Sequence, residues 1–366
     1  MNEACRTLVE WALTESPSHD GAMVNRMMDL ALGSVGPMVR VERVSGRDGL
    51  GDHLILRTPA AVEGRSGALL VGHLDTVHPP GTAASDLPVR IEGDRLFGPG
   101  VYDMKGGIFI GMQAVNRAAL SGDKPVTMII TSDEEIGSPT SRDLIEQLAA
   151  SADYALVFES GRPNGGIVTA RKGVGWFDFD VEGRSAHAGT HHADGRNAIV
   201  EAARQIVALE ALTDYERGTT VSVGTIRGGT GANVVPRCCG FSVDVRVASA
   251  EEAERIAGRI QSLRPVTPDT TIAIGGGFNR PPFTRSPGTA RLFQALHEEA
   301  ERLGQSVTEL DMTGGGSDAN FVAALGVPTL DGLGVLGHGA HTLQEHCLLS
   351  SIAPRQQLVD ALIAAL

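Results

Sequence analysis

The first half of the chain alternates between apolar residues at helical spacing and short continuous apolar runs. Residues Cys5–Leu13 and Met23–Leu32 place apolar side chains three and four positions apart, which is typical of amphipathic helices. The continuous apolar run Ala68–Leu74 indicates a strand buried on both faces. A helix, a strand, a helix and a strand are predicted next, at Lys105–Ala119, Val126–Thr131, Ser141–Ala150 and Tyr154–Phe158. Strands separated by helices predict an α/β fold with a mainly parallel sheet and helices on both of its faces.

The pattern changes near Ala170, where apolar and polar residues begin to alternate. Three runs alternate as strands with one exposed face do, at Gly175–Val181, Thr219–Ile226 and Gly240–Val247. Two helical patterns lie among them, at Asn197–Leu209 and Glu251–Leu263. We therefore predict a smaller inserted α+β domain at 171–283 with an open-faced, ferredoxin-like sheet. The larger α/β domain would consist of 1–170 and 284–366.

Charge and composition narrow the class of protein. With 31 basic and 44 acidic residues, the formal charge is −13, which argues against nucleic acid or an anionic membrane as a partner. The first residues, MNEACRTLVEWALTESPS, contain acids and a helical pattern, unlike the basic start and apolar core of a signal peptide. No apolar run approaches the ~20 residues needed to cross a bilayer. These observations predict a cytoplasmic protein without nucleic-acid or membrane partners.

The four cysteines predict no disulfide or zinc ribbon. The spacing of Cys5, Cys238, Cys239 and Cys347 matches neither a zinc ribbon nor a CxxC redox pair. Cys238 and Cys239 are neighbours in a strand pattern, where a bond between them would strain the peptide. We expect four reduced thiols that serve as small apolar residues.

A histidine and two acids stand near the ends of predicted elements. His73 and Asp75 are two residues apart at the end of an apolar strand, so their side chains lie on one face. A carboxylate in that position often orients a metal-bound imidazole, although a surface turn has the same pattern. Glycines and a proline place Asp103 in a tight turn before a helix, where it is either a ligand or a helix N-cap.

More acids follow the later apolar strands. Asp133, Glu134 and Glu135 are consecutive at one strand end, Glu159 follows another, and His341 lies in a glycine-rich segment near the end of the chain. Each alone also fits a solvated loop. Adjacent acids repel one another and resist burial, and a divalent cation removes that cost. Together these residues suit two cations ~3.5–4 Å apart, Zn²⁺ with Co²⁺ or Mn²⁺ as alternatives.

Seven motifs together resemble those of a known family. In chain order they are GHLDTV, GPGVYDMKGG, TSDEEIGS, VFESG, GRSAHAG, TGGGSDAN and GHGAH. Their order and spacing resemble the M20 metallopeptidase family, and the chain looks most similar to its glutamate carboxypeptidase branch. The resemblance covers nearly the whole chain. Any one motif is weak, whereas the set is highly specific.

The resemblance implies that five residues hold two metal ions. They are His73 and Glu159 for one ion, Glu135 and His341 for the other, and Asp103 as the bridge between them. His338 is the alternative to His341, because the sequence after His341 departs from the commoner family continuation. The family also tends to a cis peptide bond after the bridging acid, here between Asp103 and Met104.

The resemblance also implies which groups carry out the reaction. Glu134 would be the general base, and Asp75 the acid that orients the metal-bound imidazole. The inserted domain resembles the family's dimerisation or lid domain. Its His187 matches a histidine from the partner subunit that stabilises the oxyanion, although a turn histidine is the simpler interpretation.

Further positions match those that hold the substrate in the family. Asn233 and Arg246 match residues that bind the substrate carboxylate, and the fixed fork of donors on arginine suits that task. Without the resemblance, Arg246 would be a cation on a surface strand. Gly315 and Gly316 match a loop whose glycines allow close contact with the substrate backbone. A homodimer follows from the resemblance alone.

The predicted function is a di-metal, zinc-type amidohydrolase or carboxypeptidase. It would hydrolyse the amide bond of a small N-acyl amino acid or dipeptide-like substrate and release a glutamate-like residue. The ions would lower the pKa of the attacking water, and Glu134 would take its proton. The alternatives within the family are an N-acyl-amino-acid deacylase and an aromatic-amine hydrolase. Outside the enzymes, the alternative is a ligand-binding relative without turnover.

Overall fold

The computed structural model describes residues 3–62, 64–162 and 165–366, and the chain divides into two compact units. The first unit comprises Met1–Ala170, Arg285–Asp311 and Ser317–Leu366, and the second Arg171–Thr284 and Met312–Gly316. We predicted that 284–366 would lie wholly in the first domain, whereas the second unit also includes Thr284 and Met312–Gly316. The reason is that Thr313 forms a β-bridge with Arg171, whose guanidinium donates to the Gly315 carbonyl at 2.9 Å.

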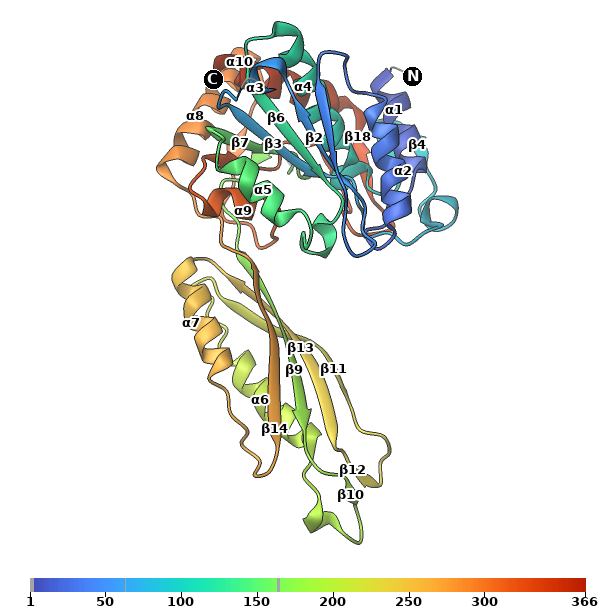
Figure 1. Ribbon diagram of the computed structural model, residues 1–366, viewed down its shortest axis with the longest axis vertical. Coiled ribbons are helices and arrows are strands. Elements are labelled where there is room, and N and C mark those ends of the chain that lie inside the picture. Colours follow the sequence, from blue (N-terminus) through green and yellow to red (C-terminus); the bar gives the residue numbers. More distant parts are fainter. Residues whose placement is uncertain (1–2, 63, 163–164) are drawn as a thin grey trace. The chain divides into compact units, whose positions relative to one another are not determined.

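The first unit contains most of the helices and short strands (Figure 1). Its helices are α1 (Glu3–Leu13), α2 (Gly21–Leu32), α3 (Pro59–Val62), α4 (Gly106–Ser121), α5 (Arg142–Ala149), α8 (Pro287–Arg302), α9 (Ala319–Ala324) and α10 (Ile352–Ala365). Its strands are β1 (Arg40–Val44), β2 (His53–Arg57), β3 (Ala68–His73), β4 (Arg90–Glu92), β5 (Arg95–Phe97), β6 (Val126–Thr131), β7 (Tyr154–Val157), β8 (Gly166–Ile167), β15 (Thr308–Glu309), β16 (Thr329–Leu330), β17 (Gly337–His338) and β18 (His346–Leu348). Single 3₁₀ turns lie at Thr82–Ala84, Glu134–Ile136 and Leu349–Ser351.

A six-stranded sheet in the order β1-β2-β6-β3-β7-β16 forms the centre of the described part of the first unit. Strands β6, β3, β7 and β16 are parallel to one another, whereas β1 and β2 are antiparallel to their neighbours. Every residue of β3 is buried, which indicates that both faces of the sheet are covered. Leu70 and Met128 pack in one core with Ile108 of α4, and the alternate residues Val71 and Ile129 are equally buried on the opposite face. The predicted α/β fold with a mainly parallel sheet is confirmed.

The second unit contains α6 (Ala198–Glu210) and α7 (Ala250–Gln261) and the strands β9 (Gly173–Glu182), β10 (Ala186–His187), β11 (Thr220–Gly228), β12 (Val234–Val235), β13 (Cys238–Val247) and β14 (Thr271–Arg280), with a 3₁₀ turn at His192–Asp194. Four of the strands form an antiparallel sheet in the order β11-β13-β9-β14. Phe177, Phe179 and Val243 pack with Ala202 of α6 and Ile256 of α7 on one face, and alternate residues of β9 are exposed on the other. The chain order β9-α6-β11-β13-α7-β14 is the ferredoxin-like βαββαβ order. The predicted open-faced α+β unit is therefore confirmed.

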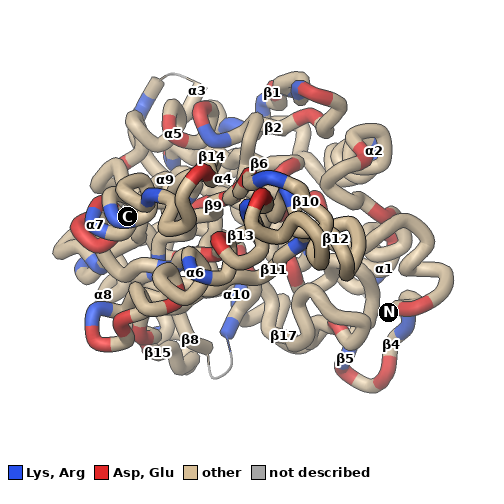
Figure 2. Tube along the Cα trace, turned by 90° about the horizontal axis from the view of Figure 1, so that it is seen from below, with Lys and Arg blue, Asp and Glu red and all other residues tan. Residues whose placement is uncertain are grey.

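The charged residues of both signs are distributed over the described part of the chain (Figure 2). Lys and Arg positions are interspersed with Asp and Glu positions along the described trace (Figure 2). None of the helices in the described residues has the length and apolar character needed to cross a membrane.

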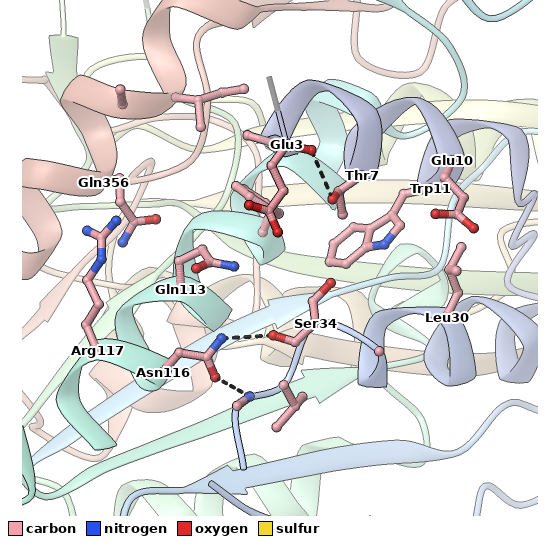
Figure 3. A pocket seen from close by; sticks show the side chains of 17 residues that line it. Glu3, Thr7, Glu10, Trp11, Leu30, Ser34, Gln113, Asn116, Arg117 and Gln356 are labelled. Atoms are coloured by element: carbon pink, nitrogen blue, oxygen red, sulfur yellow. Dashed lines mark hydrogen bonds between the residues drawn. The ribbon is translucent and has the colours of Figure 1, made fainter. Parts of the chain in front are cut away.

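A hollow of about 650 Å³ lies among α1, α4 and α10 (Figure 3). Trp11, Gln113 and Gln356 line it, and Asn116 at its edge bonds to the Ser34 carbonyl and to the Gly36 amide, both at 2.8 Å. No residue that the sequence motifs single out lies in its wall. The candidate chemistry is instead at the ends of the central strands.

Candidate metal centre

The carboxyl ends of three neighbouring parallel strands carry the predicted ligands. His73 is the last residue of β3, the turn Glu134–Ile136 follows β6, and Glu159 comes two residues after β7. Because β3 lies between β6 and β7, these side chains meet at one edge of the sheet, where sites in α/β proteins gather. Asp103, from the turn before α4, and His341, from the loop between β17 and β18, complete the cluster.

The cluster consists of two groups that share Asp103. The His73 group is His73, Asp103 and Glu159, and the His341 group is Asp103, Glu135 and His341. Within each group, one ligand atom per residue lies within 4.8 Å of the others. Within the part of the chain that the structure describes, His338 belongs to neither group. The arrangement matches two ion positions with a carboxylate between them.

The distances place one oxygen of Asp103 towards each histidine. His73 Nε2 lies 3.6 Å from Asp103 Oδ1 and 3.9 Å from Glu159 Oε1. His341 Nε2 lies 3.4 Å from Asp103 Oδ2 and 3.0 Å from Glu135 Oε2. The His341 ring is 53% exposed, whereas His73 is fully buried. The His341 group is therefore the more open of the two.

The acids of the cluster fit divalent metal ions. Asp103 Oδ1 and Glu135 Oε1 are buried and accept no hydrogen bond. Burial raises the pKa of Glu135, and burial together with the charges of Asp103 and Glu134 raises the pKa of Glu159 well above its usual value. The ionised forms of Glu135 and Glu159 are thus disfavoured unless positive charge is supplied. Burial opposes the ionised form of Asp103 as well, but His341 and His73 outweigh it and lower the pKa of Asp103. Two divalent cations with nitrogen and oxygen ligands would supply the positive charge.

The histidines lie in the same negative potential. Hydrogen bonds to Asp103 and Glu135 raise the pKa of His341 to about 11. Burial opposes the charged form of His73, but Asp103 and Asp75 outweigh it and raise the pKa of His73 well above its usual value. His73 Nδ1 donates to the backbone carbonyl of Asp75 at 3.0 Å, so the Nε2 lone pair faces the cluster. A metal ion at each position would take the place of the protons that this potential attracts.

Asp75 holds the turn that carries the acids. Its carboxylate is fully buried, with Oδ1 accepting from the Glu134 amide at 3.1 Å and Oδ2 from the Glu135 amide at 3.2 Å. Ser18 Oγ also donates to Oδ2, at 2.7 Å. The Asp75 carboxylate lies 3.5 Å from His73 Nδ1, farther than the backbone carbonyl does. Its contacts with the Glu134–Glu135 turn were not anticipated from the sequence.

Glu134 belongs to neither group of potential ligands. Its Oε2 lies 4.0 Å from His73 Nε2, and its side chain is 11% exposed. This carboxylate therefore lies beside the cluster with access to solvent.

The turn before α4 has the expected backbone geometry. The peptide bond between Asp103 and Met104 is cis, which confirms the expectation from the family resemblance. Sequence motifs did not single out Glu345, which accepts hydrogen bonds from three amides of this turn. The only sequence feature that could have indicated Glu345 is its position shortly after His338 and His341. For Ser18, the partner of Asp75, there is no local signal.

His187 and Asn233 are neighbours in the second unit. β10 pairs with β12, and the Ala188 amide donates to the Asn233 carbonyl at 3.0 Å. His187 Nδ1 accepts from the Gly189 and Thr190 amides at 3.1 and 3.2 Å, so its proton is on the exposed Nε2. The imidazole is thus prepared to donate a hydrogen bond outward.

Arg246 lies beside the glycine segment in the same unit. Arg246 Nη1 is 3.4 Å from the Gly314 carbonyl, and Nε and Nη2 each donate to Asp244 at 2.8 Å. A Cβ at Gly316 would lie 2.8 Å from side-chain atoms of Arg280 and Val174, whereas Gly315 has room. The structure therefore brings together Arg246, Gly315 and Gly316, as one set, and His187 and Asn233, as another.

Parallel strands that end in a shared cluster of carboxylates and histidines define a metal-binding α/β protein. The sequence pattern of Peptidase family M20/M25/M40 matches residues 69–365, so the chain belongs to this family. The family depends on two metal ions. The chain is accordingly a metal-dependent hydrolase of amide or peptide bonds.

Individual relatives cover most of the chain. Carboxypeptidase G2 of Pseudomonas sp. (strain RS-16) is 29% identical over 322 residues, 85% of this chain and 76% of that protein. A succinyl-diaminopimelate desuccinylase of Paracidovorax citrulli is 30% identical over 362 residues, 90% of each protein. Among solved structures, an M20 family metallo-carboxypeptidase from Sulfolobus solfataricus has the same fold, with a TM-score of 0.77 over 99% of both chains at 17% identity.

Proposed function

We propose that this protein is a di-metal amidohydrolase that releases a C-terminal, glutamate-like residue from a small N-acyl amino acid. The observation that carries the proposal is the sharing of Asp103 by the His73 group and the His341 group. His73 and Glu159 would hold one ion, Glu135 and His341 the other, with Asp103 between them. Zn²⁺ is the proposed metal, since nitrogen and oxygen donors suit it, with Co²⁺ and Mn²⁺ as alternatives.

Glu134 is the proposed general base. When bound, the ions supply positive charge that lowers the pKa of the attacking water and polarises the amide carbonyl. The Glu134 carboxylate takes the proton from that water and delivers it to the leaving nitrogen. Two features support the assignment: Glu134 is not needed as a ligand, and Asp75 holds its backbone amide in place.

His187 is the proposed donor to the carbonyl oxygen. Its Nδ1 accepts two backbone hydrogen bonds, so Nε2–H is available to stabilise negative charge on the carbonyl oxygen. Arg246 is the proposed ligand of the substrate carboxylate. Asp244 occupies the Nε and Nη2 side of its guanidinium, and the Nη1–Nη2 edge keeps donors for a second carboxylate.

The separation of these residues supports a homodimer. In β9, Glu182 pairs with Cys238 at the end near β10 and β12, and Val174 pairs with Arg246 at the opposite end. Eight residues of strand separate these pairs by roughly 26 Å, and Figure 1 shows β10 and β12 at one end of the second unit. One small substrate does not span this length. If His187 and Arg246 act on the same substrate, they come from different copies of the chain.

A panel of substrates tests the proposal. Protein loaded with Zn²⁺, Co²⁺ or Mn²⁺ is assayed with N-acyl-glutamates, N-acetyl-ornithine, N-succinyl-diaminopimelate, dipeptides and tripeptides. We expect the highest kcat/KM with N-acyl-glutamates, loss of activity on chelation and recovery on adding metal. If none of the compounds in the panel is hydrolysed, the proposal is refuted.

The second candidate is an N-acyl-amino-acid deacylase. The observation that favours it is the 30% identity to a succinyl-diaminopimelate desuccinylase across 90% of both proteins. The same panel separates the two candidates, because a deacylase would prefer the acetyl or succinyl compound over the N-acyl-glutamates.

A further inference from the structure

We propose that Glu345 is a positioning residue that couples Asp103 to His341, so that the His341 group is formed before any ion arrives. The inference rests on the proposal that the two groups hold metal ions. It assigns a specific task to a buried acid that has no role in the proposed chemical steps.

The Glu345 carboxylate is fully occupied by donors from elsewhere in the chain. It is 1% exposed. Oε1 accepts from the Tyr102 and Asp103 amides, both at 3.0 Å, and Oε2 accepts from the Gly100 amide at 3.0 Å and His78 Nε2 at 2.7 Å. An ionised carboxylate has about four acceptor positions, and all of them are in use.

The turn that Glu345 holds includes the π-helical segment Val101–Lys105, which is interrupted at its centre. Asp103 (φ −119°, ψ 95°) and Met104 (φ −132°, ψ 36°) have non-helical backbone angles just before α4. The amides of Gly100, Tyr102 and Asp103 therefore depend on Glu345 as their acceptor. Because the Asp103 amide is one of them, the carboxylate fixes the backbone from which the shared ligand projects.

Glu345 also lies in the same short loop as His341. The Gly339 carbonyl accepts from the Thr342 amide at 3.0 Å and from Thr342 Oγ1 at 2.7 Å, and the Glu345 amide donates to the Thr342 carbonyl at 3.3 Å. His341 has φ 62°, in the left-handed region that costs energy for a residue other than glycine. These bonds hold His341 and Glu345 as one body. Weakening the hydrogen bonds from the turn to Glu345 would therefore let Asp103 move relative to His341.

His78 connects the same carboxylate to the segment after β3. Its side chain is buried, and it lies five residues after His73. Glu345 is thus the point where three parts of the chain meet: the segment after β3, the turn before α4 and the β17–β18 loop.

The two groups depend on Glu345 to different degrees. In the His341 group, Asp103 and His341 both depend on it, whereas in the His73 group only Asp103 does. Glu345→Gln replaces one acceptor oxygen by an amide nitrogen. With the remaining oxygen towards Tyr102 and Asp103, that nitrogen faces the Gly100 N–H, which loses its acceptor. We therefore expect E345Q to weaken the ion site of the His341 group more than that of the His73 group.

The test is a metal titration of the whole chain after its metal has been removed with a chelator. Zn²⁺ is added in competition with a chromophoric chelator, and Co²⁺ spectra report the two sites independently of activity. Wild type is expected to bind two ions. In E345Q, one of the two affinities is expected to fall by roughly 10–100-fold, as for other residues that support metal ligands, while the other changes much less.

Glu201→Gln is the matched control. Glu201 is also a fully buried acid, and it accepts from the Val266 amide at 2.9 Å and the Thr267 amide at 2.7 Å. It lies in α6 of the second unit and holds a loop without predicted ligands. E201Q therefore loses a comparable hydrogen-bond pattern, and we expect it to bind both ions with wild-type affinity.

The outcomes separate this inference from the proposed function. If wild type fails to bind two ions, the proposed metal centre itself fails. If wild type binds two and E345Q binds both as tightly, or if E345Q weakens both equally, the coupling of Asp103 to His341 is overturned.

A second pair of variants applies if E345Q does not fold. His78→Leu leaves the carboxylate and its three backbone donors in place, and we expect it to weaken the same site by roughly tenfold. His78→Gln restores a donor and is expected to recover most of the affinity. Wild-type affinity in H78L would then count against the proposal.

Discussion

The role of Asp75 is open to a direct test with Asp75→Asn. Both carboxylate oxygens accept a backbone amide, from Glu134 and from Glu135, and asparagine has a single acceptor oxygen. Whichever way the new side chain turns, one buried amide faces an NH₂ group. An orphaned buried N–H costs about 1–3 kcal/mol, and the remaining bonds lose their charge assistance, about another 1 kcal/mol.

The expected effect on catalysis follows from where this cost falls. The turn that loses this hydrogen bond carries the proposed base and one proposed ligand. A cost of about 2–4 kcal/mol in the transition state lowers kcat/KM roughly 30- to 1000-fold. The assay measures kcat/KM at saturating metal, together with metal content. Ser18→Ala is the control, because it removes a single hydroxyl donor at 2.7 Å and leaves both amides paired.

Ser18→Ala should lower kcat/KM by roughly tenfold, the effect of one hydrogen bond to a charged group. A D75N protein within a few-fold of wild type would show that the carboxylate does not hold the turn in the way the distances indicate. Equal losses in D75N and S18A would point to the hydroxyl, and not to the paired amides, as the important partner.

Four further predictions follow from the site. Glu134→Gln should lower kcat by roughly 10²–10⁴-fold while both ions remain bound; kcat and metal content measured on one sample check this, and near-normal turnover would contradict the assignment of the base. His187→Ala should also be poorly active, and mixing it with E134Q should restore activity, because a mixed dimer has one site with both groups intact; no gain over the separate variants would exclude supply from a partner. Arg246→Ala should lower kcat/KM roughly 10–100-fold for substrates with a free carboxylate, and much less for their primary amides, which a side-by-side assay would reveal. Removing the metal should lower Tm, and more at pH 8 than at pH 5. The pKa values of Glu159 and His341 are raised in the folded protein, so their favourable protonated forms are lost as pH rises. If the Tm of the metal-free protein does not fall between pH 5 and pH 8, the acids of the cluster do not repel one another as these pKa values indicate.

Several features of the fold follow from local patterns, and others do not. The buried strand β3 and the helix α4 were predictable because their apolar periodicity is strong. β14 was not predicted, since Gly275, Gly276 and Gly277 remove the apolar signal from its middle. Its register comes from pairing with β9, a strand about 100 residues earlier in the chain. Paired strands lie roughly 4.8 Å apart across the sheet.

The sequence by itself determined which side chains are candidates for the metal centre. His73 ends one buried parallel strand, and Glu134 and Glu159 follow two others. Parallel strands bring their carboxyl ends to one edge of the sheet whatever the loops between them do. The sequence also determined the two patterns of alternation that separate the units.

Only the tertiary structure decided how these side chains are held. Asp75 turned out to bind the amides of the turn after β6, and Glu345 holds the Asp103 amide from 242 residues away. Such contacts have no local signal, because a buried carboxylate can accept from any amide that packing brings to it. The residues that carry the chemistry can be found by pattern, whereas the residues that position them are chosen by the packing of distant segments.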